Sequence, residues 1–167
     1  METLQSITSK ARKAYRDADA SVKKSLTDIF GTELLNQKLA DRIKAFKDVC
    51  DEAGVDEADY LIPTGTNEEW AALFLKRLKL IARVFNEGWK PDTANTSQYK
   101  YYPWFSIIPN TDKPSGFGLA FGGYAYGTAY TFLGARLYYR DSATAKYVGT
   151  TFLAEYESLA QYENLSR

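Results

Sequence analysis

The sequence predicts an α+β fold: a helical N-terminal half, a small antiparallel aromatic-rich β-meander and a closing C-terminal helix. Apolar residues recur at helical spacing through most of residues 1–88. Residues 99–140 contain 13 of the 25 aromatic residues. Apolar side chains in this region recur at every second position, as they do on one face of a strand. Helical spacing returns over about 142–162 and closes the chain.

The expected N-terminal helices are delimited by residues that favour helix ends. Asp19 and Asp41 are of the type that caps a helix start, and Gly31 and Gly54 follow the last apolar positions. We therefore expect helices over about 2–16, between Asp19 and Gly31 and between Asp41 and Gly54, with a short helical turn from Thr32.

A capping box marks the start of the most apolar helix. Thr66 has the side chain for the cap, and Glu69 stands at the third helical position. The helix is expected to run to Gly88 and to be central, because apolar residues cover most of its circumference. Three basic residues lie within one narrow arc of this helix. Such an arc is typical of the solvent-exposed edge of a buried helix, and a contact with an anionic partner is the alternative interpretation. The three residues are Lys76, Lys79 and Arg83.

The aromatic region predicts three strands, over 99–108, 117–126 and 129–140. Pro114 and Gly116 mark the first turn. On the third strand, Arg136, Tyr138 and Arg140 are expected on one face. Asp141 or Ser142 then caps the last helix.

The glycine-rich stretch GFGLAFGGYAYG (116–127) is predicted to be structural. A dinucleotide fingerprint needs a third glycine where Phe121 stands, and a Walker loop needs Gly-Lys-Ser/Thr. Glycines among aromatic strands instead relieve crowding between rings, and Gly122–Gly123 predicts a β-bulge.

Residues 1–167 are expected to form a single domain with one shared core. The alternative is a helical subdomain, 1–88, and a second subdomain, 99–167, that holds the meander and the last helix. The segment GWKPDTANTSQ (88–98) is the best candidate linker.

The composition excludes several functional classes. The chain has no histidine and one cysteine, Cys50, so histidine-dependent nucleophilic catalysis and the common zinc sites are excluded. The net charge is zero, which gives no general attraction to nucleic acid or to anionic membranes. The N-terminus lacks the apolar core of a signal peptide. We expect no cofactor, no metal, no membrane partner and a cytoplasmic location.

The aromatic region supplies the candidate binding residues. Within 99–140, four basic residues stand against Asp112 alone, a local charge of +3. Rings interleaved with cations on a sheet are typical of single-stranded nucleic acid binders, whereas an aromatic core with scattered cations is the structural alternative. The candidate residues are Tyr101, Trp104, Tyr124, Arg136, Tyr138 and Arg140.

Two weaker candidates lie outside this set. Exposed aromatic rings near amides and carboxylates can bind sugar rings. The residues are Trp89, Asp92, Asn95 and Asn110. The protein would then be a carbohydrate binder or a glycan enzyme that uses carboxylates. The acidic run from Asp48 to Asp59 lacks the calcium-loop pattern and is interpreted as a solvated surface.

Several motifs occur in an order that resembles small phage and prophage proteins of gut Bacteroidales-type bacteria. They are TDIFG through DRIKAFKDVCDEAG (27–54), KYYPWF (100–105) and GARLYYRDSATAKYVGTTFLAEY (134–156). Tyr138 and Tyr139 depart from the pair usual in that family. The resemblance implies a phage-encoded protein in a bacterial host cell or a virion, and it carries no activity and no catalytic residue set.

Together these observations favour a non-catalytic, phage-related interaction protein whose aromatic sheet recognises a protein partner or a second copy. Tyr, Trp and Arg dominate interface hot spots, and all three are present in the aromatic region. A single-stranded nucleic acid binder and a carbohydrate binder or glycan enzyme remain the alternatives.

Overall fold

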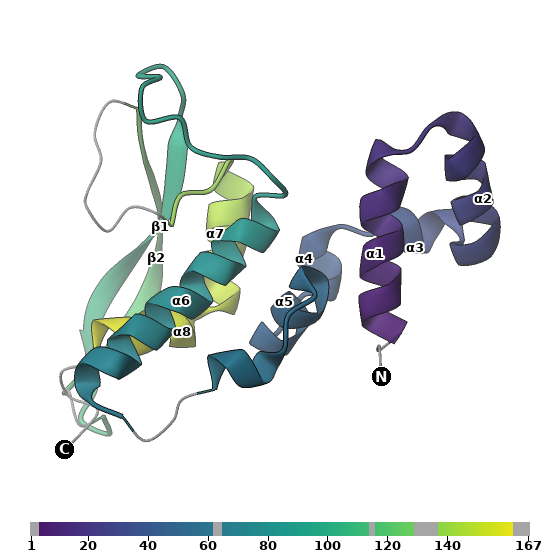
Figure 1. The fold of residues 1–167 in the computed structure, drawn as a ribbon. Coiled ribbons are helices and arrows are strands. Elements are labelled where there is room, and N and C mark those ends of the chain that lie inside the picture. Colours follow the sequence, from purple (N-terminus) through teal and green to yellow (C-terminus); the bar gives the residue numbers. More distant parts are fainter. Residues whose placement is uncertain (1–3, 62–64, 114–115, 129–136, 162–167) are drawn as a thin grey trace. The chain divides into compact units, whose positions relative to one another are not determined.

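A computed structural model describes residues 4–61, 65–113, 116–128 and 137–161 (Figure 1). The expected α+β class is confirmed, because helices form the N-terminal half and a two-stranded antiparallel sheet precedes the last helices. The chain divides into two compact units, Met1–Asp59 and Tyr60–Arg167. The division comes before the longest helix, and not at the 88–98 segment that the sequence offered as a linker.

The described part of the N-terminal unit contains five helices and the start of a 3-10 turn, Glu57–Tyr60. The predicted caps are confirmed at three ends. The Asp19 carboxylate accepts a hydrogen bond from the Val22 amide at 2.9 Å, and Gly31 and Gly54 take positive φ angles of 77° and 69°. The helices are α1 (Leu4–Asp17), α2 (Ala20–Phe30), α3 (Thr32–Asn36), α4 (Leu39–Arg42) and α5 (Phe46–Ala53).

The predicted cap at Asp41 is wrong. Asp41 lies within α4, and the chain leaves helical geometry at Ile43 before α5 begins at Phe46. Asp48 is the residue that caps this start, because its carboxylate accepts from the backbone amides of Lys44 and Ala45 at 2.9 and 3.0 Å. A carboxylate inside the first turn can satisfy these amides as well as a residue that precedes the helix.

Glu52 of α5 holds the N-terminal unit together. Its carboxylate is buried and forms a two-pronged ion pair with Arg42, in which Nη2 lies 2.9 Å from Oε1. Its backbone carbonyl accepts from Ser9 Oγ at 3.0 Å and from Lys13 Nζ at 2.9 Å, which ties α5 to α1. A second link runs from Arg12 to α3, where its Nε donates to the Leu34 carbonyl at 2.7 Å.

The second unit is built on α6 (Asn67–Phe85), whose predicted capping box is confirmed. Thr66 Oγ1 accepts from the Glu69 amide, and the Glu69 carboxylate accepts from the Thr66 amide at 2.7 Å. The buried face of α6 ends at Phe85, whose ring contacts Tyr147 and Phe152. Asn86 follows as a buried anchor: it donates to the Tyr138 carbonyl and accepts from the Arg140 amide.

The last helix differs from the prediction. The structure has two helices, α7 (Ser142–Thr151) and α8 (Leu153–Ala160), where the spacing predicts one. Asp141 caps α7 as expected, by accepting from the Thr144 amide at 2.7 Å. The break falls at Phe152, where φ is −110° and ψ is 30°. Phe152 is almost fully buried, so packing of this ring outweighs helix continuity.

The sheet is a hairpin of β1 (Lys100–Pro109) and β2 (Phe117–Gly127), both close to their predicted bounds. The predicted bulge is also present, because Trp104 pairs with Gly123 and Phe105 with Phe121, which leaves Gly122 extra. α7 and α8 pack against the hairpin, and α6 packs against α8. Residues 129–136 of the expected third strand lie outside the described residues; at its end, Tyr139 forms one bridge with Tyr101.

Candidate functional site

The hairpin brings tyrosines of both strands to one face. Tyr101 lies directly opposite Tyr126, and Tyr124 lies opposite Pro103. Because alternate residues of a strand share a face, Tyr101 stands on the same side of β1 as Pro103 and Phe105. Phe105 is covered further along by α8, where its ring lies 4.8 Å from that of Tyr156. The tyrosines thus continue the helix-covered face at the other end of the hairpin.

Four rings form one connected cluster there, in which Tyr101 contacts each of the other three, and we call them the tyrosine surface: Tyr99, Tyr101, Tyr124 and Tyr126. Ring centroids lie 5.3 Å apart for Tyr99–Tyr126 and 5.9 Å apart for both Tyr101–Tyr124 and Tyr101–Tyr126. Tyr99 is 53% exposed, Tyr124 46% and Tyr126 60%, whereas Tyr101 is half-buried at the centre. A central ring with exposed rings around it is a preformed, amphipathic contact surface.

Trp104 stands on the opposite face of the hairpin, because it is three residues from Tyr101. Its indole is 54% exposed and lies on Gly122, where an added Cβ would come within 2.4 Å of the ring. The predicted relief of crowding by glycine is therefore confirmed at this position. Of the predicted binding residues, Tyr101 and Tyr124 come together and Trp104 is separate from them.

Tyr138 is only 5% exposed, and its ring contacts that of Tyr102 at 6.1 Å. It is not a member of the tyrosine surface. Arg136 lies outside the described residues. Arg140 is described, and its guanidinium pairs with Glu87 at 2.8 Å and with Asp141 at 3.3 Å.

The other two basic side chains of this region are also engaged. Lys100 is buried, and its ammonium donates to three backbone carbonyls, those of Asn95, Gln98 and Thr128, at 3.1 to 3.3 Å. Lys113 forms an ion pair with Glu157. Burial alone would raise the pKa of Glu157, but hydrogen bonds from Lys113 and the Leu119 amide hold this pKa below its usual value. The described cations of 99–140 thus serve the fold.

The polar residues of the sugar-binding hypothesis cap turns. Asp92 accepts from the Ala94 and Asn95 amides, and the side chain of Asn95 accepts from the Ser97 and Gln98 amides. Within the described ranges no group of three or more His, Cys, Asp or Glu side chains could hold a metal ion. No described helix is long and apolar enough to cross a membrane. Cys50 is buried.

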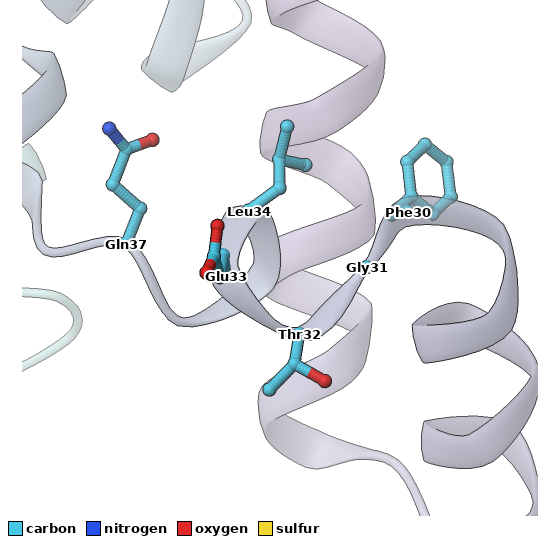
Figure 2. A pocket seen from close by; sticks show the side chains of 6 residues that line it. All are labelled: Phe30, Gly31, Thr32, Glu33, Leu34 and Gln37. Atoms are coloured by element: carbon cyan, nitrogen blue, oxygen red, sulfur yellow. The ribbon is translucent and has the colours of Figure 1, made fainter.

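The N-terminal unit has a hollow of about 600 Å³ where α2 meets α3 (Figure 2). Phe30 and Gln37 lie at opposite ends of it, with Glu33 and Leu34 between them. The Gln37 amide oxygen accepts from Arg12 at 3.2 Å, so this polar group is already engaged. The hollow is open and combines no set of groups with a recognisable chemistry.

Tyr99 and Tyr126 belong to the tyrosine surface but not to the binding residues predicted from the sequence. The signal was present, because Tyr99 is two residues from Tyr101 and Tyr126 is two residues from Tyr124. Tyrosines two apart on a strand share a face, and pairing two such strands assembles the cluster. The sequence alone does not specify the strand register, which places Tyr101 opposite Tyr126.

No protein-family model, curated protein or solved structure matched this chain.

Proposed function

We propose that the protein is a non-catalytic interaction protein and that its tyrosine surface binds a second copy of the same chain. One observation carries the proposal: four tyrosine rings form a connected cluster around Tyr101 at one end of the hairpin, and about half of each outer ring is exposed. Mutual ring contacts fix the side chains in advance, which lowers the entropy lost when a partner covers them.

The residue type suits a protein partner. Tyrosine offers a large apolar ring and a hydroxyl, and it is enriched among residues that dominate binding energy at interfaces. A net charge of zero gives little repulsion between two copies. A tyrosine surface can therefore associate with its own copy through ring packing and hydroxyl hydrogen bonds.

The single-stranded nucleic acid alternative is less well supported. Stacking on rings is effective when cations nearby contact the phosphates. Lys100, Lys113 and Arg140 are engaged by carbonyls or carboxylates, so each would have to give up a bond to contact a phosphate. Fluorescence anisotropy with a labelled oligothymidine tests this. We expect no salt-sensitive binding; tight binding lost in high salt and in Tyr101→Ala would favour the alternative.

The remaining parts of the proposal rest on the sequence. The absence of histidine removes the commonest general base and supports a non-catalytic role. The resemblance to phage and prophage proteins supports assembly in an infected bacterial cell or in a virion.

Photo-induced dityrosine cross-linking tests the contact itself. With an added photosensitiser and persulfate as the oxidant, brief illumination removes one electron and one proton from each of two phenols. Two tyrosyl radicals that touch across an interface between copies then couple through a carbon–carbon bond, and a covalent dimer results. We expect a dimer band from the wild type. Replacing Tyr99, Tyr124 and Tyr126 by Phe keeps the rings but removes the phenols of the three exposed tyrosines, so the band should weaken strongly. Tyr15→Phe with Tyr60→Phe is the matched control and should leave it. A band that is absent from the wild type, or unchanged by the triple replacement, contradicts the proposal.

A further inference from the structure

Lys100 is a buried cation directly behind the tyrosine surface. It is the first residue of β1 and lies between Tyr99 and Tyr101 in the chain. Neighbouring residues of a strand point to opposite faces, so the Lys100 side chain leaves β1 on the side away from Tyr101. Lys100 is 3% exposed. A partner on the tyrosine surface would therefore meet the rings and not this ammonium.

The ammonium ties together the two backbone segments at this end of the hairpin. Lys100 Nζ donates to the Asn95 and Gln98 carbonyls, both at 3.1 Å, and to the Thr128 carbonyl at 3.3 Å. Asn95 and Gln98 precede β1, whereas Thr128 follows β2. An ammonium has three N–H donors, so the three carbonyls use all of them. These bonds link the chain before the first strand to the chain after the second.

Two rings of the tyrosine surface stand next to the tied carbonyls. Tyr99 directly follows Gln98, and Tyr126 lies two residues before Thr128. Pairing of the two strands starts at Lys100, so Tyr99 lies outside the paired residues. Its ring nevertheless contacts the Tyr126 ring, with 5.3 Å between the centroids. The Lys100 ammonium thus joins the two backbones beside that contact.

The three bonds align the two segments and do not attach the hairpin to its helices. None of the three carbonyls belongs to a helix or a strand. The segment before β1 also has turn contacts of its own: Asp92 accepts from the Ala94 and Asn95 amides, and its own amide donates to Gln98 Oε1 at 2.7 Å. An apolar side chain would cover the same place without the free-energy cost of burying an ammonium. What the ammonium adds is the link from this segment to the end of β2.

We propose that Lys100 is a positioning residue for self-association: its ammonium holds Tyr99 and Tyr126 in the arrangement that a second copy binds. The inference rests on the proposed function. Rings that are already in place lose less conformational entropy on binding. Without the ammonium, each free copy samples other arrangements of the two rings, and the fraction that is ready to bind falls. Association then weakens although no contact with the partner is lost.

Sedimentation velocity of the full chain with Lys100→Met tests the proposal. Methionine keeps an unbranched side chain and removes the three hydrogen bonds. We expect the Kd of the dimer to rise about ten-fold. Lys113→Met is the matched control, because it removes the same charge from the other end of the hairpin, where Lys113 pairs with Glu157. It should associate like the wild type.

Hydrogen–deuterium exchange adds a readout that does not depend on association. It is measured at about 5 µM, where the wild type is expected to be monomeric. Amides of residues 99–101 and 125–128 should exchange faster in Lys100→Met than in the wild type and in Lys113→Met. A general loss of stability would raise exchange in all segments alike. Equal exchange of these two segments in Lys100→Met and the wild type overturns the proposal.

The outcomes separate this inference from the proposed function. If the wild type associates and Lys100→Met associates equally well, the positioning role alone is overturned. A wild type that stays monomeric contradicts the proposed function, and the inference with it. Lys100→Arg decides the matter if Lys100→Met loses the wild-type circular dichroism. It keeps the charge but fixes its donors in one plane, so it should associate more weakly than the wild type; equal association would overturn the proposal.

Discussion

At the scale of single residues, a pair of tyrosine hydroxyls links the bridge segment to the last helix. The hydroxyl oxygens of Tyr139 and Tyr156 lie 3.0 Å apart, and Tyr139 is fully buried. Tyr139 also exchanges two backbone hydrogen bonds with Tyr101, at 2.7 and 3.1 Å. Burial raises the pKa of both hydroxyls, so both stay protonated and one can donate to the other.

We predict that the two hydroxyls are coupled. Tyr139→Phe or Tyr156→Phe alone leaves one buried hydroxyl without its partner and should lower the free energy of unfolding by about 1–3 kcal/mol. The double variant removes both groups and should lose clearly less than the sum of the two. Urea unfolding followed by tryptophan fluorescence measures this cycle. Additive losses would show that the hydroxyls do not depend on each other.

Glu52 predicts an acid-dependent part of the stability. Burial alone would raise the pKa of its carboxyl, but the hydrogen bonds from Arg42, with the charges of Arg42 and Lys13, hold this pKa below its usual value. The folded pKa is therefore below the unfolded value of about 4.3. The stabilisation is present above that pH and is lost as pH falls through the folded pKa.

Glu52→Gln isolates this contribution. At pH 7 it should lower the free energy of unfolding by about 1–3 kcal/mol, because Arg42 loses a buried charged partner. Between about pH 5 and pH 2 the stability of the variant should fall less steeply than that of the wild type. Urea unfolding followed by far-ultraviolet circular dichroism at several pH values checks this. Parallel curves would assign the acid dependence to other carboxylates.

Some residue roles could be predicted and others could not, for physical reasons. Asp19, Thr66 and Asp141 cap helices because their side chains reach amides three positions on, which is a local property. Asp48 caps α5 from inside the helix, and the choice between it and Asp41 depends on where α4 ends. The burial of Tyr138 depends on Tyr102, 36 positions earlier in the chain, and no local pattern contains that contact.

At the scale of elements, the two edges of the hairpin are protected in different ways. The Tyr101 amide points away from β2, towards Tyr139. Pro103 and Pro109 lie on this same outer edge of β1. Because proline has no amide hydrogen, these two positions offer no donor to another strand. On β2, α8 and the residue that follows it supply side chains: Glu157 accepts from the Leu119 amide at 2.9 Å, and Gln161 donates to the Phe117 carbonyl at 2.9 Å. These side chains oppose strand pairing along that part of the edge.

Gly149 sets the distance between α7 and the hairpin. A Cβ built at this position would lie 2.6 Å from Pro103 Cβ and 2.7 Å from the Phe121 ring. Alanine favours a helix over glycine by about 1 kcal/mol, but forced overpacking costs about 1–3 kcal/mol. We predict that Gly149→Ala destabilises the protein despite its better helix propensity. Urea unfolding measures this, with Thr150→Ala on the exposed side as the control. Stabilisation by Gly149→Ala would mean that α7 can move away.

The helical elements follow from apolar spacing and caps, whereas the break between α7 and α8 does not. The apolar spacing includes Phe152 as a buried position of one continuous helix, and no proline lies near it to end that helix. The ring instead packs against Phe85, with centroids 6.0 Å apart. Tertiary packing of one ring decides this boundary, and the local sequence does not contain that information.

At the scale of the whole molecule, the chain separates into an N-terminal helical unit and a unit that contains both sheet and helices. All three tryptophans, Trp70, Trp89 and Trp104, belong to residues 60–167. Their fluorescence therefore reports on the second unit, and circular dichroism reports mainly on the helices of both. The composition change near residue 98 indicated a later boundary, because it marks where strands begin. α6 packs with α8, which keeps it with the sheet.

Sedimentation velocity tests the central claim, self-association through the tyrosine surface, most directly. Between about 5 and 200 µM, the weight-average sedimentation coefficient of the wild type should rise from that of a monomer towards that of a dimer. Tyr124→Ser with Tyr126→Ser should stay monomeric, whereas Trp104→Ser, on the other face of the hairpin, should associate like the wild type. A wild type that is monomeric over the whole range, or equal association of the two variants, would contradict the account.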